Sequence, residues 1–555
     1  MELTHCSHPV RLALECGVMR LFMFRSLMLR RRSRAVSNPL RKAERRVDVI
    51  HMPRQAAQKI SFLLLLAFFL TAKATGEPDF LGANALRDRA EIHSAFGRWF
   101  EQFRAQASPS ELHDFLWSMP KGADLHLHIT GSIFPEWWLE FALASKAQGY
   151  EYFTRVRVNN CSWLAAGEPG EASAPPDAVT EPLYFETIDG ARLETLSECV
   201  RGEFKSLLAL NGAEKAAWLN SIRLDRPGEG RDEFFEKHWQ RLGDLTANPH
   251  IVAEGLARNA LAFAEEGLHY FEPQILAEGY RRPDGQLMPI EASVSIIVDR
   301  MNEPDVVNSG IQFRFQQAIL RFLPNAEAQL ARAFEIVSSQ PSWVAVNMVG
   351  REDNDKGHPR RFLAPIRALR REYPGVALSI HGGEVDEPNS HVRDTLLLGA
   401  TRIGHAVNLI SDEELLQSMR FGPYLVEINL ISNLKLEYVQ TLDAHPFPEY
   451  LRLGVPVALS TDDRGMWDTN ITDEFFVAVH HFNLTWDELS ALSVASLSHA
   501  FLPETTKYEV IARFQAALDD FALEVMAQGV PNPSNRFQKR RAFICENYQV
   551  CGNFN

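Results

Sequence analysis

Two histidines separated by one residue are the first feature of this sequence that can do chemistry. The segment Asp124-Leu125-His126-Leu127-His128 alternates polar and apolar residues, as a β-strand does. Because successive side chains of a strand point to opposite faces, His126 and His128 should point to the same side. Two neutral imidazoles on one face can bind one divalent cation. Such a pair also arises by chance in a chain with 18 histidines, so alone it is weak evidence.

Two further groups of polar residues end apolar runs. The sequence HGGE at 381–384 adds a third imidazole and a carboxyl group, and its glycines let the backbone approach a ligand closely. Asp462 and Asp463 follow the run VPVALST, where two carboxylates leaving a buried strand are costly unless paired or bound to a cation. Each group also has a structural explanation. The glycine pair is typical of a tight turn, and an Asp can cap the next helix.

Taken together, these residues form a set of ligands suited to zinc. We expect one Zn²⁺ per chain, held by three nitrogen ligands and one oxygen ligand, namely His126, His128, His381 and Asp462. Water would take the open coordination position, and zinc lowers the pKa of bound water to about 7. His405 can orient and deprotonate this water, and Glu384 can carry a proton to the substrate. The combination indicates metal-assisted hydrolysis.

The elements that must position these residues are short strands alternating with helices. Eight apolar or β-rich runs are predicted strands: 123–129, 268–276, 311–320, 343–350, 376–384, 401–407, 424–432 and 455–463. This alternation predicts an α/β fold, a (β/α)8 TIM-type barrel with parallel strands. The run 311–320 can equally be a helix. The polar residues named above lie at the carboxyl ends of these runs, which form the active-site face of such a barrel.

Other segments flank or interrupt the predicted barrel domain, which spans residues 119–530. Residues 75–118 show helical spacing of apolar residues and predict an N-terminal helical extension, with a helix start at Ser108. Residues 161–199 begin with a stretch rich in Gly, Pro and acidic residues and predict a surface insertion after strand 1. Residues 531–555 form a C-terminal tail.

The N-terminal region has the three-part plan of a secretory signal peptide at residues 52–74. Basic residues precede an uncharged apolar run of 11 residues at 60–70, and Ala72 and Ala74 supply the small residues of a cleavage site. The run is too short for a stable membrane span, and a buried core helix is the alternative. Residues 1–51, with a net charge of +7, are a doubtful upstream extension. Either Met52 is the true initiator or these residues form a basic cytoplasmic arm.

Charge and cysteine content agree with export. The chain of 555 residues has 57 basic and 71 acidic residues, a balance that argues against a nucleic-acid partner. Without residues 1–74 the net charge becomes −24, which suits a soluble exported protein. Four cysteines remain, which permits two disulfides in any of three connectivities, the local pairings being Cys161–Cys199 and Cys545–Cys551. We therefore expect a periplasmic or extracellular location.

The motifs resemble those of the adenosine deaminase family of metal-dependent hydrolases. The resemblance rests on MPKGADLHLHITGS, HGGE, RIGHA, VEINLISN and LSTDD, and it covers roughly residues 90–525. The leading MPKGA, the N-terminal helices, the insertion and the signal peptide are similar to the secreted, growth-factor-like branch of that family. A homodimer through the N-terminal extension is one arrangement that we consider for such a chain.

This resemblance implies a role for each residue of the set. It implies the same four zinc ligands, with Glu384 as the acid that protonates ring nitrogen 1 of the purine and His405 as the base that activates water. It also implies that Asp463 contacts ring nitrogen 7 and that the backbone of Gly350, in NMVGRED, meets ring nitrogen 3. The family reaction is attack of zinc hydroxide on carbon 6 of adenine, which gives inosine and ammonia.

Three positions depart from the family pattern. Members usually carry an Asp that holds the ribose just after the HxH pair, whereas this sequence has Ile129 and Thr130. Thr130 can hydrogen-bond a hydroxyl group but lacks the charge, and a residue of the 184–242 region is the alternative ribose contact. Arg464 stands where a Pro often follows the Asp pair, and Asn429 where a Cys is common. The parts for metal binding and proton transfer are intact, and the sugar-reading part is altered.

These observations predict a zinc-dependent aminohydrolase whose partner is a small-molecule purine nucleoside. The expected reaction is deamination of adenosine or 2′-deoxyadenosine, with another 6-aminopurine or modified nucleoside as the alternative substrate. A non-catalytic, growth-factor-like interaction protein is a second class of function. The complete set of predicted metal and proton-transfer residues favours the enzyme.

Overall fold

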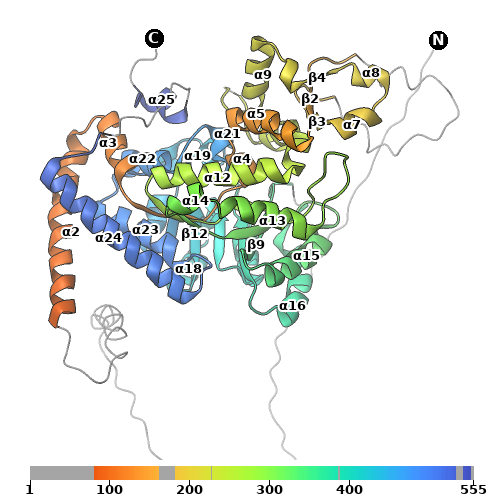
Figure 1. The fold of residues 1–555 in the computed structure, drawn as a ribbon. Coiled ribbons are helices and arrows are strands. Elements are labelled where there is room, and N and C mark those ends of the chain that lie inside the picture. The colour runs from red at the N-terminus through yellow and green to blue at the C-terminus, as the bar shows by residue number, and fades with distance from the viewer. Residues whose placement is uncertain are drawn as a thin grey trace, which may run out of the picture. The chain divides into compact units, whose positions relative to one another are not determined.

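The computed structural model describes residues 80–159, 161, 182–226, 228–354, 356–385, 388–532 and 542–551 (Figure 1). The predicted upstream extension at 1–51 and the predicted signal peptide at 52–74 lie outside the described residues. Residues Phe80–Asn555 form one compact unit. None of the helices in the described ranges is both long and apolar enough to cross a membrane.

Parallel strands close into a barrel, so the fold is the predicted (β/α)8 barrel. Seven strands pair in the order β13-β12-β11-β10-β9-β8-β6, and three more in the order β1-β5-β7. Two bridges, Leu127 with Asp462 and His128 with Gln274, connect the two sheets. The strands are β1 (Lys121–Asp124), β5 (Leu268–Phe271), β6 (Gln274–Ile275), β7 (Gln312–Phe313), β8 (Phe315–Leu320), β9 (Trp343–Val349), β10 (Ala377–Gly382), β11 (Arg402–His405), β12 (Leu425–Ile428) and β13 (Val457–Leu459).

Each of the eight predicted runs contains a strand. The ambiguous run 311–320 is extended, because β8 pairs with both β6 and β9 and these tertiary partners decide its conformation. The first run differs from its prediction. Strand β1 ends at Asp124, and the HxH pair follows it in a segment that two bridges join to its neighbours.

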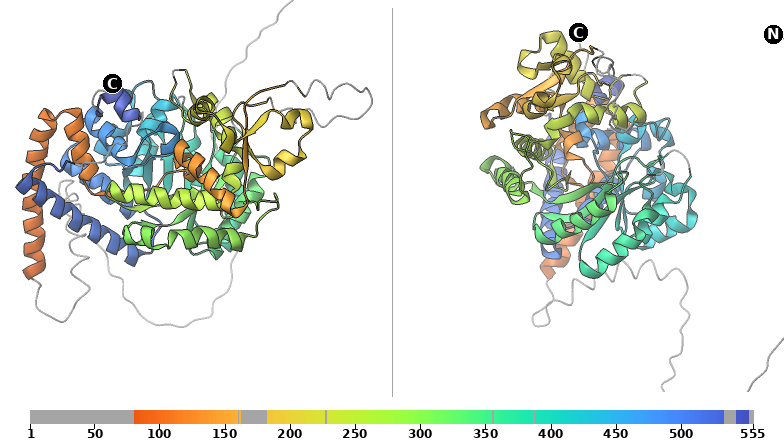
Figure 2. Two further views of the ribbon diagram at one scale, coloured as in Figure 1. Left: turned by 45° about the horizontal axis from the view of Figure 1, so that its top comes forward. Right: turned by 90° about the vertical axis from the view of Figure 1, so that its right-hand side faces the viewer.

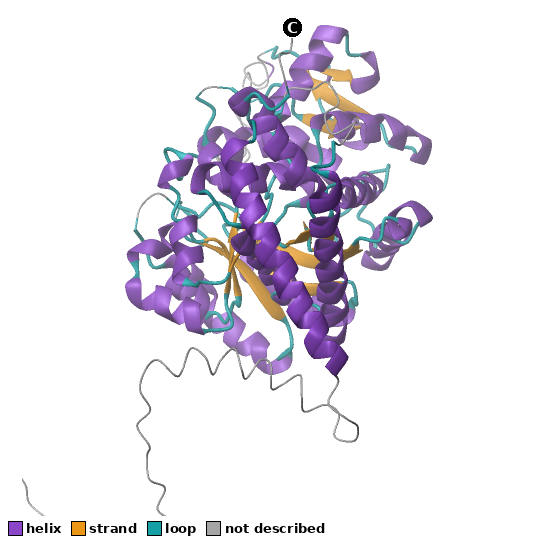
Figure 3. Cartoon of the chain, turned by 90° about the vertical axis from the view of Figure 1, so that its left-hand side faces the viewer, coloured by secondary structure: helices purple, strands orange, loops and turns teal. Residues whose placement is uncertain are grey.

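Helices surround the barrel (Figures 1 and 2; Figure 3 shows strands in orange inside purple helices). The strands are buried on both sides, which explains their nearly continuous apolar sequence. The helices that follow β1 to β13 are α4 (Ile129–Ser132), α5 (Pro135–Ala144), α12 (Pro249–Glu265), α13 (Ile290–Met301), α14 (Pro304–Asn308), α15 (Ala326–Ser339), α16 (Leu363–Glu372), α17 (His391–Leu397), α18 (Glu413–Phe421), α19 (Leu430–Lys435), α20 (Phe447–Leu453), α21 (Arg464–Trp467), α22 (Ile471–Phe482) and α23 (Trp486–Ser498).

Two helices precede the barrel, α2 (Phe80–Gln106) and α3 (Pro109–Ser118), and α2 packs on α23 and on α24 (Glu504–Gln528). Ser108 caps α3 in a reciprocal capping box with Glu111, so the predicted helix start is confirmed. Asp519 of α24 accepts hydrogen bonds from the side chains of two residues of α2, one of them Arg89 at 2.9 Å. This contact and an aromatic cluster fix the N-terminal helices to the barrel.

A separate antiparallel sheet lies between α5 and α12, and the sequence did not predict it. Its order is β3-β2-β4, with β2 (Tyr152–Arg155), β3 (Thr187–Asp189) and β4 (Phe204–Ser206). The same segment contains α7 (Gly190–Thr195), α8 (Glu198–Arg201), α9 (Gly212–Ile222), α10 (Arg231–Glu233), a π-helical turn (Phe234–His238) and α11 (Trp239–Leu242). The described part of the predicted insertion, residues 161 and 182–199, is therefore part of a longer inserted unit, residues 152–242, whose helices are mostly yellow in Figure 1; residues 162–181 lie outside the described residues.

Two disulfides join Cys161 to Cys199 and Cys545 to Cys551, which are the local pairings among the three possible connectivities. The first disulfide ties the inserted unit to itself. The second closes a short loop at α25 (Phe543–Tyr548), a helix within the predicted tail.

Candidate metal centre

Four predicted ligands converge at the carboxyl ends of β1, β10 and β13. His126 and His128 lie just beyond β1, His381 lies within β10, and Asp462 follows β13. The backbone bridge between Leu127 and Asp462 brings the first and last of these segments side by side. Both imidazoles of the HxH pair reach the same carboxylate, as the predicted alternation requires.

Three of the distances between these side chains are close to the spacing of neighbouring ligand atoms around a metal ion. His126 Nε2 lies 3.5 Å and His128 Nε2 3.3 Å from Asp462 Oδ1. His128 Nε2 lies 3.2 Å from His381 Nε2. Ligand atoms about 2.0–2.1 Å from a tetrahedral zinc ion are about 3.3–3.4 Å apart. His128 therefore lies close to Asp462 and His381, and the ligating atoms of His126, His381, His405 and Asp462 all lie within 4.8 Å of one another.

Burial and charge at this cluster also fit a cation. His126 Nε2 and Asp462 Oδ1 are buried and lack a hydrogen-bond partner among the described residues, which is costly unless something positive lies between them. Burial lowers the pKa of His126, but the neighbouring carboxylates of Asp462 and Glu427 raise it to about 10. The surrounding carboxylates thus favour positive charge at this point, and a bound cation would supply it.

His405 lies at the end of β11, beside the ligands. Its Nε2 is 3.8 Å from Glu384 Oε1, and its ring centroid is 4.8 Å from that of His126. The His405 backbone is left-handed, with φ 65°, and this turn directs the side chain towards the cluster. Its ligating atoms lie within 4.8 Å of those of His126, His381 and Asp462, so His405 is near enough to act on a water at the metal.

Two residues that the sequence reasoning missed orient the ligand imidazoles. Glu427 of β12 accepts a hydrogen bond from His126 Nδ1 at 2.8 Å, and Asn347 of β9 lies 3.2 Å from His381 Nδ1 through its Oδ1. Such contacts set the tautomer of a metal-binding histidine. Arg402 Nε lies 2.7 Å from Glu427 and completes this buried layer. The available signal was a charged residue within an apolar strand, as in LVEI at 425–428.

Glu384 is held by its backbone in the loop after β10. The Glu352 carboxylate accepts hydrogen bonds from the backbone amides of Gly383 and Glu384 at 3.1 and 3.4 Å. Arg321 donates to the carbonyl of His381 at 2.7 Å and lies 3.6 Å from Glu352. Burial raises the pKa of Glu384 well above its usual range, and the charges of Asp462 and Glu352 raise it further. This shift favours the protonated form of Glu384, which can donate a proton.

Asp463 does not act as the helix cap that its position allowed. It precedes α21, but its side chain makes no capping hydrogen bond. The carboxyl group instead packs on Gly131, where a β-carbon would lie 1.6 Å from Oδ1, so only glycine fits there. Burial and the charge of Asp462 raise the pKa of Asp463 well above its usual range. A protonated Asp463 can donate a hydrogen bond to a ring nitrogen.

Gly350 follows β9 at the same end of the barrel. Its φ is 102°, and a β-carbon would lie 2.6 Å from the ring of Phe322. Both facts require glycine at this position, because a side chain would be strained and would collide with the Phe322 ring.

Thr130 lies in α4, two residues after His128, and is half-buried. The inserted unit also reaches this place, because the Trp239 ring of α11 lies 6.3 Å from the His128 ring, centroid to centroid. Phe234 of the neighbouring π-helical turn packs on Trp467 of α21. The structure therefore brings residues of the 184–242 region beside the metal cluster, as the alternative to Thr130 for the sugar contact requires.

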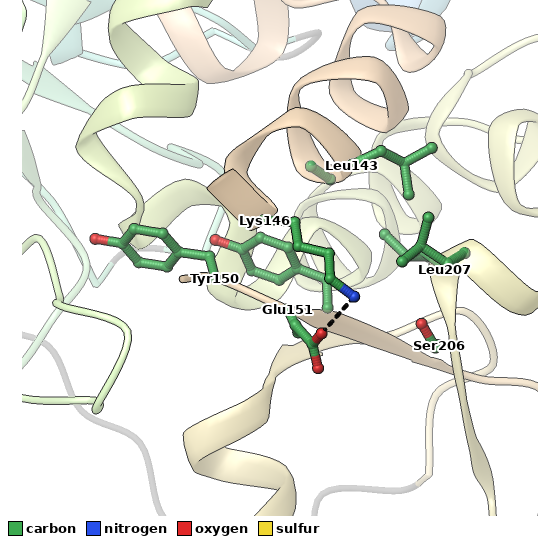
Figure 4. Close-up of a pocket in the computed structure, with 9 residues that line it drawn as sticks. Leu143, Lys146, Tyr150, Glu151, Ser206 and Leu207 are labelled. Carbon is green, nitrogen blue, oxygen red and sulfur yellow. Dashed lines mark ion pairs between the residues drawn. The ribbon is translucent and has the colours of Figure 1, made fainter. Parts of the chain in front are cut away.

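A shallow pocket away from the metal cluster lies between the end of α5 and β4 (Figure 4). Leu143, Tyr150 and Leu207 line it, and Lys146 pairs with Glu151 across it at 2.8 Å. Both charged side chains are half exposed and neutralise each other. None of the predicted site residues lines this pocket.

The fold and the cluster define a barrel hydrolase of the metal-dependent class. The sequence profile described as adenosine deaminase matches residues 243–517. This range includes His381, His405 and Asp462 but begins after the inserted unit, so the structure, and not the profile, joins the HxH pair to the site. The chain belongs to the adenosine deaminase family.

Similar proteins act on different adenine compounds, according to their names. The human N6-methyl-AMP deaminase is 26% identical over 280 residues, which cover 49% of this chain and 77% of the relative. The adenosine deaminase of Plasmodium falciparum is 28% identical over 300 residues, which cover 52% and 77%. Membership of the family therefore leaves the substrate open.

Solved structures show the same barrel. An amidohydrolase from Burkhoderia ambifaria with bound zinc has a TM-score of 0.53 and 17% identity, covering 75% of this chain and 95% of that one. The adenine deaminase from Arthrobacter aurescens has a TM-score of 0.51 and 16% identity, covering 74% and 99%. At these identities the likeness concerns the fold.

Proposed function

We propose that this protein is a zinc-dependent enzyme that deaminates adenosine or 2′-deoxyadenosine by hydrolysis, releasing ammonia. The observation that carries the proposal is the convergence of three imidazole side chains and one carboxylate: His126 Nε2 and His128 Nε2 lie 3.5 and 3.3 Å from Asp462 Oδ1, and His128 Nε2 lies 3.2 Å from His381 Nε2. Glu384, whose pKa is raised by burial, lies beside this cluster. The metal, the acid and the attacking water would then lie around the reacting carbon atom of the substrate. The intact site argues against a purely non-catalytic, growth-factor-like role.

Each residue has a distinct task in this mechanism. His126, His128, His381 and Asp462 would hold a zinc ion, and the chemistry that such an ion would supply is a lowered pKa of bound water. Glu384 gives its proton to ring nitrogen 1, which makes carbon 6 electrophilic. Asp463 donates to ring nitrogen 7, and the backbone at Gly350 faces ring nitrogen 3. His405 orients the attacking water through Nε2.

Charges beside Gly350 favour a nucleoside over a nucleotide. Arg351 pairs with Asp232 at 2.6 Å and also with Asp353, and Arg231 lies 3.7 Å from Asp353. These guanidinium groups already have carboxylate partners, so a phosphate placed here would meet negative charge. The competing substrate is a nucleoside monophosphate such as the N6-methyl-AMP that names several relatives.

The test is a substrate panel on the purified, zinc-loaded protein. Adenosine and 2′-deoxyadenosine should be converted to their 6-oxo products, identified by chromatography, faster than adenine or N6-methyl-AMP. Zinc should be present at about one ion per chain, and His381→Ala should lose metal and activity together. Equal activity of metal-free His381→Ala would refute the site, and a preference for N6-methyl-AMP would refute the substrate assignment.

We also propose that the protein is exported to the periplasm or the extracellular space. The signal-peptide pattern at 52–74 supports this, as do the two disulfides, which persist in oxidising compartments. N-terminal sequencing of the native protein should find a start directly after Ala74. A mature start upstream of Met52 would contradict both the signal peptide and Met52 as initiator.

A further inference from the structure

A chain of buried hydrogen bonds leads from a backbone amide to His405. The backbone N–H of Phe447 donates to His445 Nδ1 at 3.1 Å. His445 Nε2 lies 3.1 Å from Asn433 Oδ1, and Asn433 Nδ2 lies 3.0 Å from His405 Nδ1. His445, Asn433 and His405 are each at most 1% exposed, so water does not compete for these contacts.

The backbone amide fixes the direction of every bond in this chain. A backbone N–H can only donate, so His445 Nδ1 accepts and the proton of this neutral ring lies on Nε2. Burial keeps His445 neutral by lowering its pKa to about 3. His445 Nε2 therefore donates to the Asn433 oxygen. The amide group of Asn433 then has no freedom to turn, and its NH2 group faces His405.

His405 Nδ1 must consequently accept a hydrogen bond. The Asn429 amide also contacts this nitrogen, with Nδ2 at 3.2 Å. Asn429 can turn either way, because its Oδ1 has no hydrogen-bond partner among the described residues, and it therefore adapts to the tautomer that Asn433 imposes. A neutral His405 with a lone pair on Nδ1 carries its proton on Nε2, the nitrogen that faces Glu384 and the metal ligands.

We propose that Asn433 and His445 are positioning residues that fix the proton of His405 on Nε2, so that His405 donates a hydrogen bond to the attacking water instead of taking its proton. This inference rests on the proposed function for the identity of the water. It differs from the role of base that the family resemblance implies for His405. To act as a base, Nε2 would need a lone pair, and the displaced proton on Nδ1 would face the N–H of Asn433.

The proton lost by water then needs another acceptor, and Glu384 is placed to be this acceptor. Its Oε1 lies 3.8 Å from His405 Nε2. Glu384 first gives its own proton to ring nitrogen 1 and becomes a carboxylate, which then takes a proton from the attacking water. The O–H bond of water breaks, and a C–O bond forms at carbon 6. As a net result, H adds to ring nitrogen 1 and OH adds to carbon 6, and Glu384 returns to its protonated form.

Nitrogen-15 NMR of histidine-labelled holoenzyme measures the tautomer directly, and His405→Gln identifies the signal. We expect His405 to show a protonated Nε2 and an unprotonated Nδ1. A protonated Nδ1 with a bare Nε2 in the native protein would overturn the proposal, whether or not adenosine is the substrate. A correct tautomer without deaminase activity would instead refute only the proposed function.

Asn433→Asp tests the cause, because a carboxylate can accept from both histidines. The NMR signal should switch to a protonated Nδ1, and kcat should fall by about 100-fold with KM changed less than about threefold, as for loss of one well-placed donor. Asn302→Asp, the same change at the exposed end of α13, should alter neither. An unchanged His405 tautomer in folded Asn433→Asp would show that Asn433 does not set it. If that variant does not fold, the native spectrum still decides.

Discussion

Glu427 offers a sharp test of how the barrel interior prepares the metal ligands. Its carboxylate accepts from His126 Nδ1 at 2.8 Å and from Ser379 Oγ at 3.1 Å, and it lies 2.7 Å from Arg402 Nε. Glu427→Gln keeps the shape of the side chain but replaces one oxygen with an NH2 group. Whichever way the amide turns, an N–H faces either the imidazole or the guanidinium.

The expected cost is divided between metal affinity and stability. Loss of an outer partner of a metal-binding histidine lowers metal affinity about 10- to 100-fold, which is about 1.4–2.7 kcal/mol. Arg402 keeps a second carboxylate, Glu272, at 2.7 Å. The free energy of unfolding should therefore fall by about 1–3 kcal/mol, less than the 3–5 kcal/mol expected for a buried charge left alone.

Competition between the protein and a zinc-binding indicator dye measures the affinity, and chemical denaturation measures the stability. Glu414→Gln is the matched control, because the Glu414 side chain is 89% exposed, and it should change neither quantity. An unchanged zinc affinity in folded Glu427→Gln would refute the conclusion that Glu427 orients His126 for the metal. A loss of stability alone would assign Glu427 only to the charge balance of Arg402.

Three further changes test other parts of the molecule. Glu384→Gln should retain zinc and lose at least about 100-fold in kcat, and a near-normal rate in the variant would show that Glu384 is not the proton donor. Because only protonated Glu384 donates, the kcat of the native protein should also fall as pH rises through the elevated pKa of this residue. Thr130→Asp should lower KM for adenosine by up to about tenfold. If the variant has the same KM values as the native protein for both adenosine and 2′-deoxyadenosine, another residue makes the sugar contact. Replacing Cys161 and Cys199 with Ser removes a cross-link over 38 residues, which contributes about 4 kcal/mol of loop-closure entropy to stability. Limited proteolysis should then cut the inserted unit faster than in the native protein, while kcat stays unchanged. Equal protease resistance of the two proteins would contradict this prediction.

The barrel and its principal site residues could be predicted because their signals are local. Apolar runs of strand length mark where the chain is covered on both sides, and polar residues at the ends of such runs mark the active face. His126, His381 and Asp462 were found in this way, without any knowledge of which strands are neighbours. The two disulfide pairings also followed the local spacing of the cysteines among three possibilities.

Other features depend on contacts between distant segments and have no local signal. The run 311–320 became strand because β6 and β9 lie beside it, and the antiparallel sheet of the inserted unit joins short strands with unremarkable sequences. The tautomer of a histidine depends on which atom its far nitrogen meets. For His126 that atom belongs to Glu427, 301 residues away, and for His405 to Asn433. The sequence determined which groups can react, whereas tertiary structure decided their proton positions, because a hydrogen bond depends on spatial neighbours and not on neighbours along the chain.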